Sequence, residues 1–86
     1  MKFPVAIEPG HATQAWGVVV PDLPGCFSAS DIGFEEAIAC AHEAIEIWIE
    51  TTLEMGHVMP KPSDISQLQK LKEFKGWKWS MVEFKS

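Results

Sequence analysis

The 86-residue sequence contains no arginine and no tyrosine, and it has only two cysteines. Arginine is the side chain best suited to bidentate contacts with phosphates and base edges, so its absence argues against nucleic-acid recognition. No apolar run approaches the roughly 18 residues needed to cross a bilayer, and the N-terminus lacks the apolar core of a signal peptide. These absences predict a single cytoplasmic domain over residues 1–86, in which Cys26 and Cys40 are free thiols.

The charge is distributed unevenly along the chain. The net charge is −5, but residues 1–59 hold one lysine and nine carboxylates, whereas residues 60–86 hold six lysines and three carboxylates. An acidic chain without arginine is poorly suited to bind nucleic acid. It is suited to bind a basic protein, because complementary fields steer association.

Alternating apolar residues predict four strands, at 3–8, 15–20, 26–30 and 77–84. The second and third strands are separated by a turn with four characteristic residues: Pro21, Asp22, Pro24 and Gly25. Pro-Gly fits the central positions of a type II turn, where glycine accepts a positive φ. The aspartate admits two interpretations, a general base or a carboxylate that accepts backbone N–H groups and fixes the turn.

Apolar residues at spacings of three and four predict a long helix over 34–54. Gly33 is the expected N-cap and Gly56 the expected C-terminal cap. A second, shorter helix is predicted to begin at Ser63 and to end at Gly76.

The element order predicts an α+β fold, β-β-β-α-β, with a mixed sheet ordered 3-2-1-4 and the long helix packed on one face. A strand reached through a helical crossover is usually parallel to its new neighbour, so the last strand is expected to run parallel to the first. The faces expected to meet the helix carry Phe3/Val5/Ile7, Trp16/Val18/Val20 and Trp77/Trp79/Met81. The opposite face would be partly uncovered and available for self-association, as would the third strand at the sheet edge; it carries Ala6, Gly17, Val19, Ser80 and Val82.

The long helix carries an acidic stripe opposite its apolar side: Glu43, Glu46, Glu50 and Glu54, with Glu36 near its start. One interpretation is an ordinary solvated face. The other is a docking surface for a basic protein, favoured because no lysine lies four residues away to neutralise these carboxylates.

No pattern predicts catalysis, a cofactor or a metal site. His11, His42 and His57 lack metal-ligand spacing, and Cys26 has no neighbouring base that would activate a nucleophile. Trp77 and Trp79 alternate as a buried strand face would, which is a better explanation than base stacking. The residues alone therefore indicate a small acidic binding module and not an enzyme.

One combination of motifs resembles a known family. Its segments are 3–8, Val-Val-Val-Pro-Asp-Leu-Pro-Gly-Cys-Phe at 18–27, Glu-Glu-Ala at 35–37, Pro-Lys-Pro-Ser at 60–63, and the strand at 77–84. Together they resemble the HicB-like antitoxins. The resemblance implies a partial ribonuclease-H-like fold, an antitoxin that covers a small basic mRNA-cleaving toxin of the HicA type, and repression of its own operon.

Members of that family commonly add a C-terminal DNA-binding segment. The sequence ends at Ser86, so none is expected here, and these residues are not expected to bind DNA directly. The chain is either a short member or a fragment of a longer protein. An alternative function is a self-associating module of a transcriptional regulator, as a homodimer or higher homo-oligomer, without catalysis.

Overall fold

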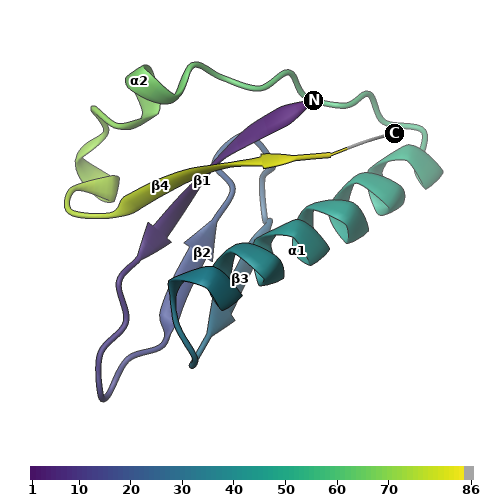
Figure 1. Cartoon of the computed structure of the whole chain (residues 1–86). Coiled ribbons are helices and arrows are strands. Elements are labelled where there is room, and N and C mark those ends of the chain that lie inside the picture. The colour runs from purple at the N-terminus through teal and green to yellow at the C-terminus, as the bar shows by residue number, and fades with distance from the viewer. Residues whose placement is uncertain (85–86) are drawn as a thin grey trace.

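The computed structural model describes residues 1–84, which form a four-stranded sheet with one long helix packed across it (Figure 1). The elements in chain order are β1 (Lys2–Glu8), β2 (Trp16–Val19), β3 (Phe27–Ser30), α1 (Phe34–Glu54), α2 (Ile65–Leu68), the 3-10 turn η1 (Lys72–Phe74) and β4 (Lys78–Glu83). The α+β class, the β-β-β-α-β order and the bounds of the long helix are confirmed. Among the described residues, no helix combines the length and hydrophobicity that crossing a membrane requires.

The strand order β3-β2-β1-β4 is confirmed, but β4 runs antiparallel to β1, not parallel. The prediction assumed that a single helical crossover leads directly into the last strand. α1 does bring the chain back to the end of the sheet where β1 begins, but residues 55–77 then cross to the other end (Figure 1). β4 therefore starts beside the end of β1, and all three strand pairs are antiparallel.

The prediction that Trp77, Trp79 and Met81 face α1 is wrong, because β4 turns its other side to the helix. Val82 lies opposite Phe3 of β1 and belongs to the core beneath α1. Side chains alternate along a strand, so Trp79 and Met81 point to the far face of the sheet. The alternation of apolar residues in the sequence shows which residues of β4 share a face. It does not show which of the two faces meets α1, because a shift of one residue in the pairing exchanges the two faces.

The far face of the sheet, expected to be partly uncovered, is covered over β1 by the turn that precedes β4. Ala6 is fully buried there, and Phe74 of η1 is only 8% exposed. The Phe74 ring meets Trp77 and Trp79 edge to face, with ring centroids 5.2 and 5.4 Å apart. The face is more open at its two edges, where Phe27 of β3 is 65% exposed and Met81 of β4 is 45% exposed.

α1 is held on the sheet by one apolar side. Its buried residues recur every four positions along the helix: Ala37, Ala41, Ile45 and Ile49. The two alanines allow close approach to the sheet, and the two isoleucines fill the space toward β1 and β2 with Phe3, Val5 and Val18. This spacing is the expected signature of a surface helix with a single buried stripe.

Both ends of α1 are capped mainly by backbone groups. Gly33 is the N-cap, as predicted, without a side-chain hydrogen bond, and Glu35 and Glu36 place negative charge in the first turn, where the helix dipole favours it. At the other end, Gly56 has φ 78° and its N–H donates to Leu53 O at 3.0 Å. The His57 N–H donates to Thr52 O at 3.0 Å, which completes a Schellman motif.

The second helix is shorter than predicted and begins later. α2 ends at Leu68, far before Gly76, and its N-cap is Asp64 instead of Ser63. The Asp64 carboxylate accepts the Ser66 N–H at 3.0 Å, and this bond, with a second one from the Ser66 hydroxyl, lowers the pKa of Asp64. Ser63 is not free to cap because it is bonded elsewhere, to Asp22.

Two isoleucines of α1 test how far the helix depends on its buried side. Replacing Ile45, which is 1% exposed, with alanine should lower the free energy of unfolding by about 2–4 kcal/mol, because a cavity is left in the core. The matched variant Ile47→Ala changes a side chain that is 63% exposed and should cost less than about 1 kcal/mol. Urea denaturation followed by tryptophan fluorescence measures both values, and similar costs would contradict this packing.

Candidate functional site

The turn between β2 and β3 is a compact corner at residues 20–26, closed by three backbone hydrogen bonds. Leu23 N–H donates to Val20 O and Cys26 N–H to Leu23 O, each at 3.0 Å, and Val20 N–H donates to Cys26 O at 3.1 Å. Gly25 has φ 80°, the value that the third position of a type II turn requires. Leu23 and Cys26 are 1% and 3% exposed, so the corner turns two side chains into the core.

Two contacts from distant segments fix this corner. The Asp22 carboxylate accepts the Ser63 N–H at 2.7 Å and the Ser63 hydroxyl at 2.5 Å. The Trp48 indole N–H of α1 donates to Pro24 O at 2.8 Å. The Asp22 carboxylate therefore accepts a backbone N–H, as one interpretation of the sequence expected, but this N–H belongs to the connector after α1 and not to the turn itself.

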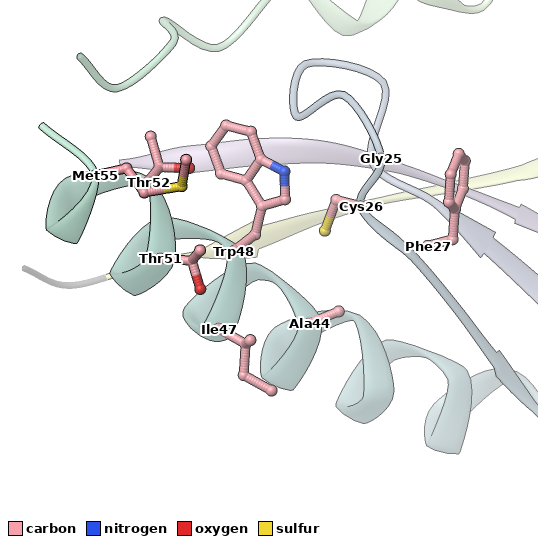
Figure 2. Close-up of a pocket in the computed structure, with 9 residues that line it drawn as sticks. All are labelled: Gly25, Cys26, Phe27, Ala44, Ile47, Trp48, Thr51, Thr52 and Met55. Carbon is pink, nitrogen blue, oxygen red and sulfur yellow. The ribbon is translucent and has the colours of Figure 1, made fainter. Parts of the chain in front are cut away.

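The groups near the corner do not form a catalytic arrangement. Burial raises the pKa of the Cys26 thiol, which disfavours the thiolate that a nucleophile needs. Asp22 is engaged by Ser63, and Figure 2 shows the Cys26 sulfur turned toward α1, among apolar side chains. Within residues 1–84, no three histidine, cysteine or acidic side chains lie close enough together to hold a metal ion.

The four predicted docking carboxylates all lie on α1, but they do not have the same surroundings. Glu43, Glu50 and Glu54 are exposed on the outer side of the helix. Glu46 is partly buried and turned toward β4, with one carboxylate oxygen 3.3 Å from His42 Nδ1. α1 itself contains no lysine, so its outer surface is acidic along most of its length.

The structure also reveals two hollows that the sequence analysis did not identify, one along each flank of α1. The flank beside β3 borders a hollow of about 500 Å³, shown in Figure 2. Its lining is uncharged and mostly apolar: Gly25, Cys26, Phe27, Ala44, Ile47, Trp48, Thr51, Thr52 and Met55. The flank beside β4 borders a hollow of about 570 Å³ that includes charged groups: Ile38, Ala39, His42, Glu46, Met81, Val82 and Glu83. The sequence signal for the hollow beside β3 was the presence of apolar residues outside the buried stripe, namely Ile47 of α1 and Met55 immediately after the helix.

Known structures define the class to which this arrangement belongs. The fold matches the crystal structure of the N-terminal domain of the Burkholderia pseudomallei antitoxin HicB, with a TM-score of 0.83, 33% identity and complete coverage of both chains. It matches the HicB chain of that organism with a TM-score of 0.86 and 33% identity, over 98% of this chain and 63% of that one. A chain of the HicA3 and HicB3 toxin-antitoxin complex matches with a TM-score of 0.81, 26% identity and complete coverage of both.

The sequence places the chain in the same class. Residues 3–86 match the family model of the HicB-like antitoxin of bacterial toxin-antitoxin systems, and the chain belongs to this family. It is also 39% identical, over 83 residues, to an uncharacterized 14.9 kDa protein from the rep-hol intergenic region of Haemophilus phage HP1 (strain HP1c1). That match covers 96% of this chain but only 60% of the phage protein.

Removal of the Asp22 carboxylate tests whether it joins the corner to the connector. Asp22→Ala should lower the free energy of unfolding by about 1–2 kcal/mol, because two hydrogen bonds to a charged group are lost. Ser63→Ala should cost less, because it removes the hydroxyl but keeps the N–H donor. Chemical denaturation gives the two values, and amide exchange at Ser63 should quicken in Asp22→Ala alone. Equal costs, with no change in exchange, would contradict the bracing role.

The two cysteines should differ in reactivity. Cys26 is 3% exposed and burial raises its thiol pKa, whereas Cys40 lies partly exposed on α1. At neutral pH, iodoacetamide should therefore modify Cys40 at least about tenfold faster than Cys26. Mass spectrometry of the native protein measures the two rates, and the difference should disappear in 6 M guanidinium. Faster modification of Cys26 in the native protein would show an activated thiol.

Proposed function

We propose that this domain is an antitoxin that binds a small basic toxin and covers its active surface. The family supports this, and a relative of the same fold is part of a complex whose toxin is HicA3. The observation on this chain that carries the proposal is the acidic outer surface of α1, defined by Glu43, Glu50 and Glu54. A basic partner is the class of protein that such a surface attracts.

The charge distribution suits an oriented encounter. The carboxylates lie along α1, whereas four of the lysines follow α2 or lie on η1 and β4: Lys70, Lys72, Lys75 and Lys78. An incoming basic protein is drawn toward the helix and repelled from the other end of the chain. Apolar contact must then slow dissociation, because exposed ion pairs alone contribute little to affinity. The hollow between α1 and β4 offers such contact at Ile38, one helical turn from His42 and near the acidic Glu46.

The proposed mechanism is binding without catalysis, in the cytoplasm. Cys26 is shielded from solvent, and Asp22 serves the corner. The lack of arginine also makes direct binding of DNA by residues 1–86 unfavourable, so the regulatory part of the family's function is not assigned to them. A toxin inhibited by occlusion needs one antitoxin domain per toxin and no turnover.

Charge reversal on α1 tests the docking surface. Glu43→Lys/Glu50→Lys should slow association with the toxin about three- to tenfold at low ionic strength, because the steering field is removed. The dependence of the association rate on salt should become weaker. The matched control Asp31→Lys/Glu73→Lys makes the same change in net charge at exposed positions away from the outer side of α1, and should slow association less.

The toxin for this measurement is the small lysine- and arginine-rich protein encoded beside the antitoxin. Co-expression should yield a complex and restore growth, and surface plasmon resonance at several salt concentrations gives the rates. If both double variants associate equally fast, α1 is not the docking surface. If the neighbouring protein neither arrests growth nor binds, the antitoxin proposal itself is wrong.

One observation favours a second activity, self-association of this domain as a homodimer within a regulator. The strand β3 lies at the edge of the sheet and carries no charged side chain, although the chain has a net charge of −5. Self-association is compatible with toxin binding, because the acidic surface of α1 faces away from the sheet.

A further inference from the structure

β4 ends the sheet on the side away from β3, and within residues 1–84 no further strand lies beyond it. Phe84 N–H donates to Met1 O at 2.7 Å, and the Met1 amino group donates to Phe84 O at 3.2 Å, so these two residues form a hydrogen-bonded pair. Such pairs alternate with others along an antiparallel ladder, and the next one in this register joins Phe3 to Val82. The peptide groups of Val82 therefore face β1, whereas those of Met81 point out of the sheet.

The hollow of about 570 Å³ beside β4 opens next to this edge, and we call it the α1–β4 hollow. It is lined by Ile38, Ala39, His42, Glu46, Met81, Val82 and Glu83. Its walls are apolar at Ile38, Ala39 and Val82, and its polar groups on the helix side are His42 and Glu46. Met81 points its side chain to the other face of the sheet, so it borders the hollow along the edge of the strand. The hollow and the outward peptide groups of β4 therefore form one continuous surface.

Glu46 is the carboxylate that α1 contributes to this hollow. Its side chain is 47% exposed, and one of its oxygens lies 3.3 Å from His42 Nδ1. An ionised carboxylate has about four acceptor positions on its two oxygens, so the contact with His42 leaves Glu46 able to accept from a second donor. A long cationic side chain suits such a site, because its aliphatic stem packs on apolar walls while its charged end reaches the carboxylate.

We propose that a basic partner protein adds an extended segment to the sheet at β4 and places one long cationic side chain in the α1–β4 hollow, against Glu46. The backbone of the segment pairs with the outward peptide groups of Met81, as peptides do when they extend the exposed edge of a sheet. Side chains alternate along a strand, so one from the segment lies beside Val82 on the side of α1 and enters the hollow. This inference rests on the proposed antitoxin function and names the place where its partner is held.

Charge identifies the occupant and its position along the strand. A second copy of this chain would bring its own α1, which contains no lysine and exposes Glu43 and Glu50. A segment with arginine or lysine instead neutralises Glu46, after the outer side of α1 has drawn it in. The start of β4 is already occupied by a cation, because Lys78 Nζ lies 5.6 Å from the centroid of the Phe34 ring. The basic side chain is therefore attracted to the later part of β4, where the hollow lies.

Amide hydrogen exchange, followed by NMR, reads the strand pairing directly. In the free domain the Val82 N–H, which faces β1, should exchange slowly, and the Met81 N–H should exchange quickly. In the complex with the basic protein encoded beside this chain, exchange at Met81 should slow at least about tenfold, because its N–H gains an acceptor. Ala29 is the matched control, since the same alternation points its N–H outward at the β3 edge of the sheet. Unchanged exchange at Met81, or slowing at Ala29 alone, would overturn the proposal.

A lysine inside the hollow tests the cationic site. His42→Lys places a cation of the chain itself four residues before Glu46, where it competes with the side chain of the partner. It should raise the dissociation rate of the complex at least about tenfold. The matched control Thr51→Lys adds the same charge at an exposed position on the opposite flank of α1, and should raise that rate much less. Surface plasmon resonance measures both rates, and equal rates for the two variants would overturn the site.

Removal of the carboxylate provides a second variant that adds no side-chain bulk. Glu46→Gln keeps the shape of the side chain and loses its charge, so it should also raise the dissociation rate. The matched change Glu50→Gln, on the outer side of the helix, should mainly slow association. Equal dissociation rates for these two variants would likewise count against a cation held by Glu46.

The β4 site and the antitoxin function can fail separately. Glu43→Lys/Glu50→Lys should associate more slowly but still protect the Met81 N–H in the complex, since neither residue borders the hollow. A toxin complex that forms without protecting Met81, and that His42→Lys does not weaken, would overturn the β4 site and leave the antitoxin function intact. A neighbouring basic protein that does not bind at all would overturn both.

Discussion

The structure depends on burying β1 from both sides. Phe3, Val5 and Ile7 are fully buried beneath α1, and Pro4 and Ala6 are buried on the other face. One helix covers only one face of a sheet, so a second segment must lie over the other. Phe74 and the two tryptophans around it do this for β1. The path of the connector across the molecule, and with it the antiparallel direction of β4, follows from this requirement.

The elements that could be predicted from the sequence are those whose signals are local. α1 was predicted to the residue, because its apolar spacing and its two glycine boundaries act within a few turns. The order of the strands was also predicted correctly. The direction and facing of β4 were not, because both depend on where residues 55–77 place the chain before the strand begins. The usual preference for a parallel strand after a helical crossover does not apply here, because the connector returns across the sheet before β4 begins.

The same distinction applies to the candidate site. The carboxylates of α1 could be placed on one side of the helix from their spacing, but the turn of Glu46 toward β4 and its contact with His42 depend on packing. The partner of Asp22 was beyond prediction, because Ser63 lies 41 residues away in the sequence. The apolar hollow beside β3 was likewise hidden, since it is built by two elements that are each ordinary by themselves. Sequence patterns describe single elements well, whereas sites arise where elements meet.

Two surfaces of the domain, the outer side of α1 and the edge of the sheet at β3, suit different kinds of contact. The outer side of α1 is acidic and exposed, and it suits a fast, salt-sensitive encounter with a basic protein. β3 lies at the edge of the sheet without a charged side chain, and its exposed Phe27 suits apolar contact. Because the two surfaces do not share residues, one domain can use both at once.

The pairing of β1 with β4 joins two strands that are separated by about 70 residues of sequence. During synthesis β4 emerges long after β1, and until then one side of β1 has no neighbour. Because contacts between segments far apart in the sequence carry a larger loop-closure cost than local ones, the sheet is completed later than α1. A newly made copy therefore passes through a stage in which both sides of its unfinished sheet are open. An antitoxin whose supply must follow that of its toxin would be delayed by this step of its own folding.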